Sequence, residues 1–244
     1  MKIEYYPTTK AYPMYLEKLK GLARKPDVIK VCDIGGGANP LFSKEQVEEY
    51  GLDYTVLDIS AEELAKAPEK YNKIQADITD SNFSLDGEYD LVISKFLAEH
   101  ISDAASFHQN IFSLLKDGGY SFHYFPTLYN LPFIANRLLP ENLSYPILLF
   151  FQPHRVKEGK RGKFPASYNW CFGPTKKNIE RFTSLGYSIE EYIGFFGHRF
   201  YQKSKILKPL DLLEQLKMQL LLRYPVPLMT QFAQVMLRKE ALLD

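Results

Sequence analysis

Three successive glycines and one acidic residue further along the chain carry the clearest chemical signal in this sequence. Residues 31–40 read VCDIGGGANP, an apolar run that leads into the glycines. A second apolar run, YTVLDI, contains Asp58 near its end. Glycines let the backbone turn sharply and pass close to a ligand, and a carboxylate one strand later accepts hydrogen bonds from both hydroxyls of a ribose. The spacing therefore predicts a nucleoside-binding site at the carboxyl ends of parallel strands.

The glycine spacing differs from that of a dinucleotide-binding loop. A G-x-G-x-x-G loop places its third small residue at the start of a helix whose amides face a pyrophosphate. Gly35 and Gly37 fill the first two places, but the third falls on Pro40. Proline has no N–H for a phosphate, although it suits the first turn of a helix capped by Asn39. We therefore expect a ligand without a pyrophosphate.

Length, composition and charge limit the fold and the partners. With 244 residues, of which 45% are hydrophobic and 24% charged, the chain suits one α/β domain with an insertion. Its net charge of +1 gives no broad attraction for a polyanion, so no nucleic-acid partner is expected. Cys32 and Cys171 form no C-x-x-C pair, which favours a reducing cytoplasm. The opening MKIEYYPTTK lacks the apolar core of a signal sequence, and the apolar stretches 143–151 and 220–229 fall short of the ~20 residues of a membrane span.

Short apolar runs alternate with segments that have one apolar face, which is typical of a doubly wound sheet with helices on both sides. Strands are expected before the glycines, before Asp58, and at residues 73–76, 89–94, 120–125, 188–195 and 231–237. Helices are expected at residues 12–22, from a capping box at Ser60 and Glu63 to Pro68, from a cap at Ser102 to a stop at Gly118 and Gly119, after Pro174 and Thr175, and at 208–223. The expected parts are an N-terminal helical segment (1–27), a Rossmann-like core (28–125), an insertion (126–172) and a C-terminal completion of the sheet (173–244).

Several motifs between about residue 28 and about residue 125 resemble those of the class I S-adenosylmethionine-dependent methyltransferases, and they occur in the same order. Besides VCDIGGGANP they are the carboxylate that ends the second strand, QADIT, YDLVISKFLAEHI and LLKDGGY. The family pattern D-x-G-x-G is met by Asp33, Gly35 and Gly37, whereas Asn39 replaces the third glycine often found there. The resemblance implies an α/β fold with a mostly parallel, doubly wound sheet of seven strands whose last strand is antiparallel, and S-adenosylmethionine as cofactor.

The resemblance also implies a role for each matching position. Asp33 would lie near the amino group of the methionine moiety, and the glycines would let the main chain run beside the cofactor. Asp58 would bind the ribose hydroxyls, and Asp77 would accept a hydrogen bond from the adenine amino group. Ser94 and Lys95 would line the methionine side through their backbone. The implied cofactor positions are Asp33, Gly35, Gly36, Gly37, Asn39, Asp58, Ile59, Asp77, Ile78, Ser94 and Lys95.

Methyl transfer from a sulfonium depends chiefly on holding the nucleophile in line with the S–CH3 bond at about 3 Å. An acceptor oxygen of high pKa also needs a general base, and His100 and His123 lie nearest to the expected strand ends. For both residues a purely structural role is the alternative. His154 and His198 lie on segments without an expected element, and no histidine pair has zinc-ligand spacing, so no metal is expected.

The expected insertion is rich in aromatic residues, enough to line a pocket for a ring or an acyl chain. Its basic residues would suit a phosphate-bearing substrate or an anionic membrane surface. A small buried cap and an ordinary solvated loop are the structural alternatives for these two features. The aromatic residues are Tyr129, Phe133, Tyr145, Phe150, Phe151, Phe164, Tyr168 and Trp170, and the basic ones are Arg155, Lys157, Lys160, Arg161 and Lys163.

Two later segments, KFPASYNWCFGPT and GFFGHRFYQK, are loosely similar to those of bacterial methyltransferases associated with cell-surface glycan or lipid synthesis. Together these features predict a cytoplasmic enzyme that moves a methyl group to a small-molecule or carrier-linked acceptor at oxygen, with peripheral membrane contact left open. The alternatives are an inactive methyltransferase-like binding protein, a nicotinamide-dependent oxidoreductase, and a protein that mainly attaches to membranes. Turnover, ligand titration and sedimentation with anionic liposomes would distinguish them.

Overall fold

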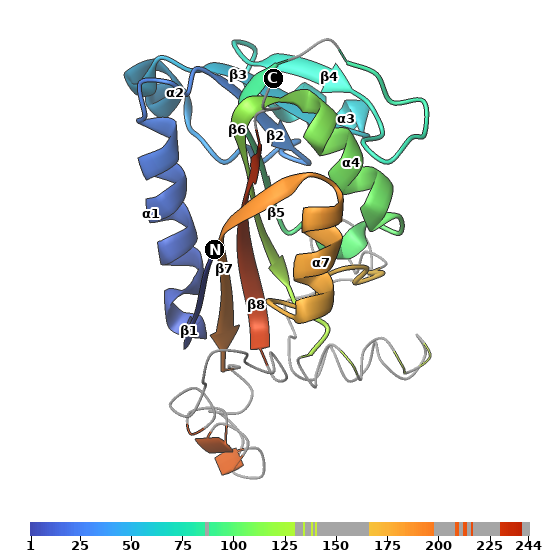
Figure 1. Cartoon of the computed structure of the whole chain (residues 1–244). Helices are drawn as coiled ribbons and strands as arrows, with labels where there is room; N and C mark the ends of the chain where they lie inside the picture. Colours follow the sequence, from blue (N-terminus) through green and yellow to red (C-terminus); the bar gives the residue numbers. More distant parts are fainter. Residues whose placement is uncertain are drawn as a thin grey trace.

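The computed structural model describes residues 1–85, 88–129, 166–197 and 230–240, together with positions 134, 138, 140, 208, 209, 212, 213 and 216. These residues build one mixed sheet of eight strands in the order β1-β7-β8-β6-β5-β2-β3-β4 (Figure 1). β8 runs antiparallel to β6 and β7, and every other neighbouring pair is parallel. The strands are β1 (Lys2–Pro7), β2 (Lys30–Ile34), β3 (Asp53–Asp58), β4 (Asn72–Gln75), β5 (Tyr89–Lys95), β6 (Leu115–Pro126), β7 (Tyr187–Phe196) and β8 (Thr230–Lys239). The helices are η1 (Thr8–Lys10), α1 (Ala11–Ala23), α2 (Lys44–Tyr50), α3 (Ala61–Lys66), η2 (Ala98–His100), α4 (Ala104–Leu114) and α7 (Lys176–Ser184).

The predicted doubly wound sheet is confirmed, and β1 extends the seven expected strands by an eighth at one edge. β1 pairs in parallel with β7, with Lys2 opposite Glu191 and Pro7 opposite Phe196. The Tyr5 ring of β1 covers Gly194 of β7, where an added Cβ would lie 2.6 Å from a ring carbon. β1 was not predicted, because this fit depends on a glycine far along the chain and leaves no local pattern in the sequence.

Each face of the sheet is covered by its own helices, with α1 on one side and α4 and α7 on the other (Figure 1). α1, α2 and α3 pack into one core cluster through Tyr15, Val47 and Leu64, respectively. α4 and α7 pack into a second cluster through Phe107 and Phe182. The central strands are therefore buried on both faces, which explains why they read as unbroken apolar runs in the sequence.

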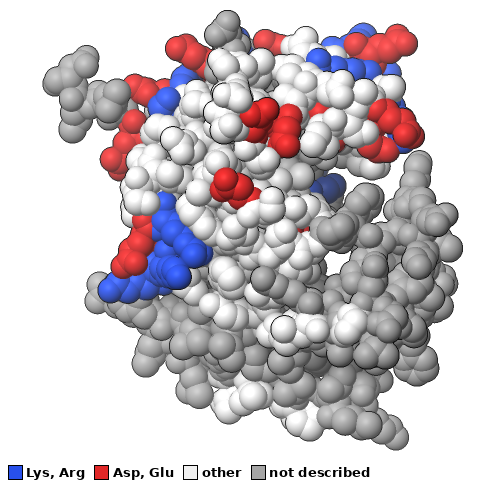
Figure 2. Space-filling view, turned by 90° about the vertical axis from the view of Figure 1, so that its right-hand side faces the viewer, with Lys and Arg blue, Asp and Glu red and all other residues white. Residues whose placement is uncertain are grey.

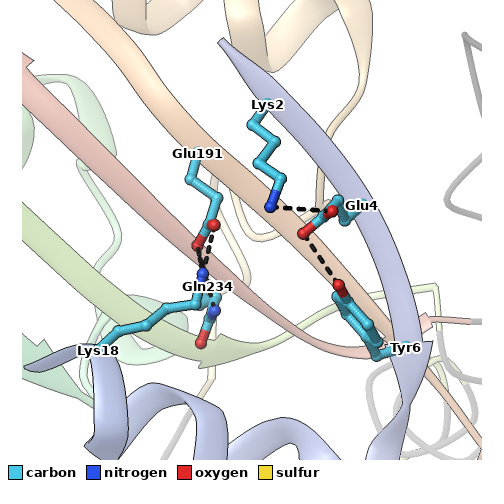
Figure 3. Close-up of polar contacts among 6 residues, drawn as sticks. All are labelled: Lys2, Glu4, Tyr6, Lys18, Glu191 and Gln234. Atoms are coloured by element: carbon cyan, nitrogen blue, oxygen red, sulfur yellow. Dashed lines mark hydrogen bonds and ion pairs between the residues drawn. The ribbon is translucent and has the colours of Figure 1, made fainter.

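Polar side chains attach α1 to the sheet, and others bond to one another along β1 (Figure 3). Lys18 of α1 forms an ion pair with Glu191 of β7. On β1, a Glu4 carboxylate oxygen lies 3.0 Å from the Lys2 ammonium, and the other accepts a hydrogen bond from the Tyr6 hydroxyl at 3.1 Å. The Lys18 pair is mostly shielded from water, so it is screened less than the exposed pairs of this chain. It holds α1 in a defined place on the sheet.

The boundaries of α4 differ from the prediction. Asp103, not Ser102, caps the helix, because its carboxylate accepts hydrogen bonds from two N–H groups of the first turn, each at 3.1 Å. The helix ends at Leu114, and Gly118 and Gly119 lie inside β6 instead of forming the stop. Gly118 has a φ of +78°, and a Cβ on Gly119 would lie 2.8 Å from a backbone oxygen. The two glycines thus serve an irregular stretch of β6.

Other expectations are confirmed or lie outside the described residues. Ser60 caps α3 as predicted, by accepting a hydrogen bond from the Glu63 N–H. α7 begins after Pro174 and Thr175 as predicted, and Thr175 is its cap, because its hydroxyl accepts a hydrogen bond from the Asn178 N–H. The expected helix at 208–223, most of the insertion 126–172 and the apolar stretches 143–151 and 220–229 are not described, apart from isolated positions. In the described part of the chain, no helix has the length and hydropathy needed to cross a bilayer.

The face of the molecule that carries α4 and α7 bears charges of both signs (Figure 2). Acidic and basic side chains lie next to one another at the left and at the upper right of this view, and further acidic side chains lie between these groups on a largely uncharged surface. Such a mixed distribution gives no single strong field over this face.

Candidate cofactor and active site

The strand order brings the carboxyl ends of β2, β3 and β5 side by side, and we call the region at these ends the crevice. β2 lies between the other two strands, with Ile34 opposite Leu57 on one side and Ser94 on the other. The chain leaves β2 toward β3 on one side, whereas β5 lies on the other side. In open α/β sheets, ligands bind where the strand order reverses in this way. The glycine loop, Asp58 and Lys95 therefore border one site.

The glycine loop after β2 passes so close to the strand ends that side chains do not fit there. Gly35 and Gly37 have φ values of +70° and +34°, a region that glycine adopts readily. A Cβ on Gly36 would lie 2.7 Å from a carboxylate oxygen of Asp33, and a Cβ on Gly37 would lie 2.8 Å from one of Asp58. The loop thus lies directly against two carboxylates, one from β2 and one from β3.

Asp33 is buried beneath this loop and holds it in place. Its Oδ2 atom accepts hydrogen bonds from the Leu41 N–H at 2.8 Å and from the Tyr54 hydroxyl at 2.6 Å. Burial raises the pKa of Asp33 to about 6, because it disfavours the charged form more than the two donors and the Lys95 charge favour it. Asp33 therefore joins the segment after the glycine loop to β3.

The helix after the loop begins later than the sequence predicted. Ser43, not Asn39, is the cap: its hydroxyl accepts a hydrogen bond from the Gln46 N–H at 3.3 Å, and the Gln46 side chain accepts one from the Ser43 N–H at 3.0 Å. Asn39 lies in a turn, where its N–H donates to the Gly36 oxygen at 2.7 Å. The helix start at Lys44 is therefore separated from the glycines, and the loop lacks the helix N-terminus that a pyrophosphate needs.

Asp58 offers a carboxylate oxygen at the end of β3. Its Oδ1 accepts a hydrogen bond from the Ser60 N–H at 2.9 Å, which fixes the carboxylate at the turn into α3. No group in the described ranges donates to Oδ2, the oxygen that lies beside Gly37. The neighbouring Ile59 is 65% exposed, which is unusual for an isoleucine. Asp58 and Ile59 thus provide an acceptor and an apolar surface side by side.

Asp77 and Ile78 follow β4 and differ in their surroundings. Asp77 is exposed, and its Oδ1 accepts hydrogen bonds from the N–H and the hydroxyl of Thr79, at 2.8 and 2.7 Å. The Ile78 side chain is buried in the core, and its carbonyl accepts a hydrogen bond from Asn110 at 2.8 Å. The backbone N–H of Ile78 and the second carboxylate oxygen of Asp77 have no hydrogen-bond partner among the described residues.

His123 does not reach the crevice. The residue is fully buried, with Nδ1 2.7 Å from the Ser94 hydroxyl and Nε2 hydrogen-bonded to the Ser121 hydroxyl. Burial lowers the pKa of His123 to about 3, so the imidazole is neutral. Both ring nitrogens are occupied inside the core, which makes this candidate base a link between β5 and β6 in the structure. The Ser94 carbonyl is also used, since it accepts a hydrogen bond from Tyr15 at 3.1 Å.

His100 and Glu99 lie together in η2, directly after β5. His100 is exposed, and its Nε2 lies 3.8 Å from Glu99 Oε1. Glu99 is buried, and its backbone carbonyl accepts hydrogen bonds from the N–H groups of Ser167 and Tyr168. Burial raises the pKa of Glu99 to about 8, and no described residue bonds its Oε2. Sequence reasoning missed Glu99, since nothing around it indicates burial. His154 and His198 lie outside the described residues.

Comparison with known proteins identifies the family. Residues 10–161, more than half of the chain, match the model of a family described as a methyltransferase domain. The chain belongs to this family. None of the curated proteins compared with the chain matches it.

Solved structures share the fold of this methyltransferase at low sequence identity. A SAM dependent methyltransferase from Archaeoglobus fulgidus matches with a TM-score of 0.54 and 16% identity, over 95% of each chain. Phosphoethanolamine N-methyltransferase 2 from Haemonchus contortus, in complex with S-adenosyl-L-methionine, matches with a TM-score of 0.57 and 15% identity, over 94% of this chain and 53% of that chain. Geranyl diphosphate C-methyltransferase from Streptomyces coelicolor matches with a TM-score of 0.55 and 9% identity, over 93% of this chain and 78% of that chain.

The predicted family, class I fold, enzyme class and S-adenosylmethionine cofactor of this methyltransferase are thereby confirmed. The crevice fits such a cofactor chemically. Its glycine loop leaves room for close approach of a ligand, and Asp58 has a carboxylate oxygen without an internal donor in the described structure. When bound, S-adenosylmethionine supplies a methyl group on a positively charged sulfur.

Proposed function

We propose that the methyltransferase binds S-adenosylmethionine in the crevice between the loops after β2 and β5 and transfers the methyl group to an oxygen of a small-molecule or carrier-linked acceptor. The observation that carries this proposal is the Asp58 carboxylate, whose Oδ2 lies against the glycine loop and has no donor among the described residues. A carboxylate with one oxygen fixed by the turn and one free is suited to the two hydroxyls of a ribose.

The proposed roles of the other residues around the crevice follow from placing the ribose of the cofactor at Asp58. Gly35, Gly36 and Gly37 let the main chain run along the cofactor, and Asp33 and Asn39 shape that loop from within. Ile59 covers one face of the adenine, while Asp77 and the Ile78 N–H meet its edge. The backbone of Ser94 and Lys95 borders the methionine side. These assignments are supported by the positions of the residues at neighbouring strand ends.

The proposed reaction requires positioning more than chemistry from the protein. The acceptor oxygen attacks the methyl carbon opposite to the sulfur, which leaves as a neutral thioether. For an acceptor hydroxyl of high pKa, His100 is the candidate base, because it is exposed at the end of β5 and has the Glu99 carboxyl behind it. His123 is not used, because both of its ring nitrogens are hydrogen-bonded inside the core.

The proposed class of acceptor is supported by the similarity of the fold and of the sequence to other methyltransferases. The solved methyltransferases named for phosphoethanolamine and geranyl diphosphate act, by those names, on small molecules. The similarity to enzymes of cell-surface glycan or lipid synthesis comes from residues 163–175 and 194–203, and part of both ranges lies outside the described residues. A role in such synthesis is therefore proposed on sequence grounds.

Calorimetry with S-adenosylmethionine and S-adenosylhomocysteine tests the assignment of Asp58. Replacing Asp58 with alanine removes two charge-assisted hydrogen bonds, so the binding free energy should fall by about 2–3 kcal/mol, which is about 30- to 150-fold in affinity. Asp53→Ala is a matched control, because Asp53 lies at the opposite end of the same strand. A loss below threefold for Asp58→Ala, or an equal loss for the control, would remove Asp58 from the site.

The same titration separates two alternatives. A nicotinamide dinucleotide should not bind, since α2 begins only at Lys44 and offers no helix N-terminus at the glycines. An inactive relative would bind S-adenosylmethionine but leave its methyl group in place with every hydroxylated acceptor, and consumption of the methyl donor distinguishes it from an enzyme.

A further inference from the structure

Four aromatic side chains form a connected group at the carboxyl ends of β5 and β6. We call Tyr12, Phe96, Tyr124 and Phe232 the ring platform. The Phe96 ring lies 5.0 Å from that of Tyr124 and 5.9 Å from that of Phe232, and the Tyr124 and Phe232 rings are 5.4 Å apart. Tyr12 completes the group, with its ring 6.2 Å from that of Tyr124. These separations are in the range of direct ring contacts.

Phe96 is held in an unfavourable conformation at the centre of this group. Its φ of +54° lies in the left-handed region, which is costly for a bulky residue. The Phe96 N–H donates to the Tyr124 carbonyl at 2.9 Å, which fixes the backbone there. The ring nevertheless remains 43% exposed. The strained backbone leaves the Phe96 ring about half exposed to water, so this conformation contributes little to the stability of the fold. Strain of this kind is concentrated at ligand-binding sites.

The ring platform borders the proposed cofactor crevice. Phe96 follows the last residue of β5, and the next residue, Leu97, contacts the glycine loop, where a Cβ on Gly35 would lie 3.0 Å from its side chain. On the other side, Tyr12 lies in the first turn of α1. That turn is fixed above β5, because the Tyr15 hydroxyl donates to the Ser94 carbonyl at 3.1 Å. The platform is therefore placed where an acceptor would face the methyl group.

Two polar groups accompany the rings. The Lys95 ammonium lies 5.6 Å from the centre of the Tyr12 ring and, within the described ranges, forms no ion pair with a carboxylate. Its charge reaches the buried Asp33 only through space. The Tyr124 hydroxyl has no hydrogen-bond partner in the described structure, and burial raises its pKa, so it remains a donor. One cation and one donor thus accompany an apolar, flat surface.

We propose that the ring platform and Lys95 bind a phenolic acceptor, that is, an aromatic ring with an ionisable hydroxyl directed at the Lys95 ammonium. This inference rests on the proposed function, which it extends by naming the substrate class. A flat ring stacks on aromatic side chains, and an ammonium group favours the ionised oxygen. A sugar hydroxyl ionises far less readily than a phenol, and an acyl chain gives the cation no partner.

The chemistry balances without a further reactant. The phenol gives its proton to water, and Lys95 stabilises the resulting oxygen anion. This oxygen forms a bond to the methyl carbon while the carbon–sulfur bond breaks, and the electron pair of that bond goes to sulfur. The products are an aryl methyl ether and S-adenosylhomocysteine. A phenol ionises far more readily than an alcohol, with a pKa near 10 for the tyrosine side chain, so this acceptor needs less help from His100.

The test uses p-nitrophenol as a probe with the full chain saturated with S-adenosylhomocysteine. At a pH where the free probe is mostly protonated, binding should increase the visible absorbance of the phenolate. Lys95→Met should weaken binding about tenfold and abolish the absorbance change, because the stem is kept and the charge is lost. Phe96→Leu should weaken binding about threefold or more. Lys25→Met is the matched control, since Lys25 also lies over a tyrosine ring, 4.3 Å from the centre of Tyr120, and should change nothing.

The outcomes separate this inference from the proposed function. Each variant is first tested for its affinity for S-adenosylhomocysteine, so that a loss of p-nitrophenol binding is separated from a loss of the fold or of the cofactor site. If the cofactor binds but p-nitrophenol does not, or if cyclohexanol and methyl glucoside bind equally well, the phenolic acceptor is refuted while the cofactor site stands. Equal effects of Lys95→Met and Lys25→Met would refute it as well. If S-adenosylhomocysteine itself does not bind, both proposals fail.

Discussion

The buried carboxyl group of Glu99 should make the stability of the protein depend on pH, and Glu99→Gln should remove this dependence. Burial raises the pKa of Glu99 from 4.5 to about 8, and its Oε2 has no partner among the described residues. A pKa raised in the folded state means that folding favours the neutral acid. The stability from this group is therefore complete below about pH 4.5 and is lost as the pH rises through about 8.

The size of the effect follows from the two pKa values. They differ by about 3.5, and each pKa unit corresponds to about 1.36 kcal/mol, so ionising Glu99 in the folded protein costs up to about 5 kcal/mol. Glutamine resembles the neutral acid in size and polarity. At pH 5 the two proteins should therefore differ by about 1 kcal/mol or less in free energy of unfolding, and at pH 9 the variant should be more stable by about 3–5 kcal/mol.

Urea unfolding of both proteins at several pH values between 5 and 9 measures this difference directly. Other titrating groups, such as Asp33, affect both proteins equally and cancel. Glu180→Gln on α7 is a control, because Glu180 is exposed and its replacement should change stability by about 0.5 kcal/mol or less at every pH. A difference between wild type and Glu99→Gln that stays constant with pH would refute the burial argument.

Two substitutions around the glycine loop have predictable effects. Gly36→Ala should cost about 1–3 kcal/mol of stability and weaken cofactor binding, because its Cβ would lie 2.7 Å from an Asp33 oxygen that two donors hold in place. Gly21→Ala is the control. A Cβ at Gly21 would have no atom within 4 Å, so this change should instead stabilise α1 by about 0.5–1 kcal/mol. Thermal unfolding compares the two, and equal effects would contradict the close packing of the loop. Tyr54→Phe should cost about 1.5–3 kcal/mol at pH 8 and less below about pH 6, where Asp33 is protonated and accepts more weakly. Urea unfolding at pH 5 and 8 checks this, and a loss that is larger at pH 5 would speak against the Tyr54–Asp33 bond.

The strands at the centre of the sheet could be predicted from the sequence because burial on both faces makes them continuous apolar runs. β1 could not, since its position depends on the fit of Tyr5 to Gly194 on a distant strand. The capping residue was predicted correctly at Ser60, where one candidate stands alone. The prediction of a cap at Ser102 was wrong, because Asp103 is a second candidate directly beside it. The local sequence does not show which of two adjacent residues accepts hydrogen bonds from the free N–H groups of the first helical turn.

Sequence alone pointed to strand ends that the structure brings side by side, but it could not judge the state of the side chains there. His123 looked suitable as a base because it lies on a strand near the site, yet its face of the strand points into a core where two serines take both nitrogens. Glu99 shows the reverse case. A glutamate is usually exposed, whereas Glu99 is buried and its backbone is bonded to Ser167 and Tyr168, which lie far along the chain.

A crystal structure of the protein with S-adenosylhomocysteine tests the central claim most directly. We predict that the ligand lies between the glycine loop and the end of β5, with both ribose hydroxyls on the Asp58 carboxylate and the sulfur toward the side of the crevice where Phe96 lies. A ligand bound elsewhere, or a ribose that makes no contact with Asp58, would contradict the account.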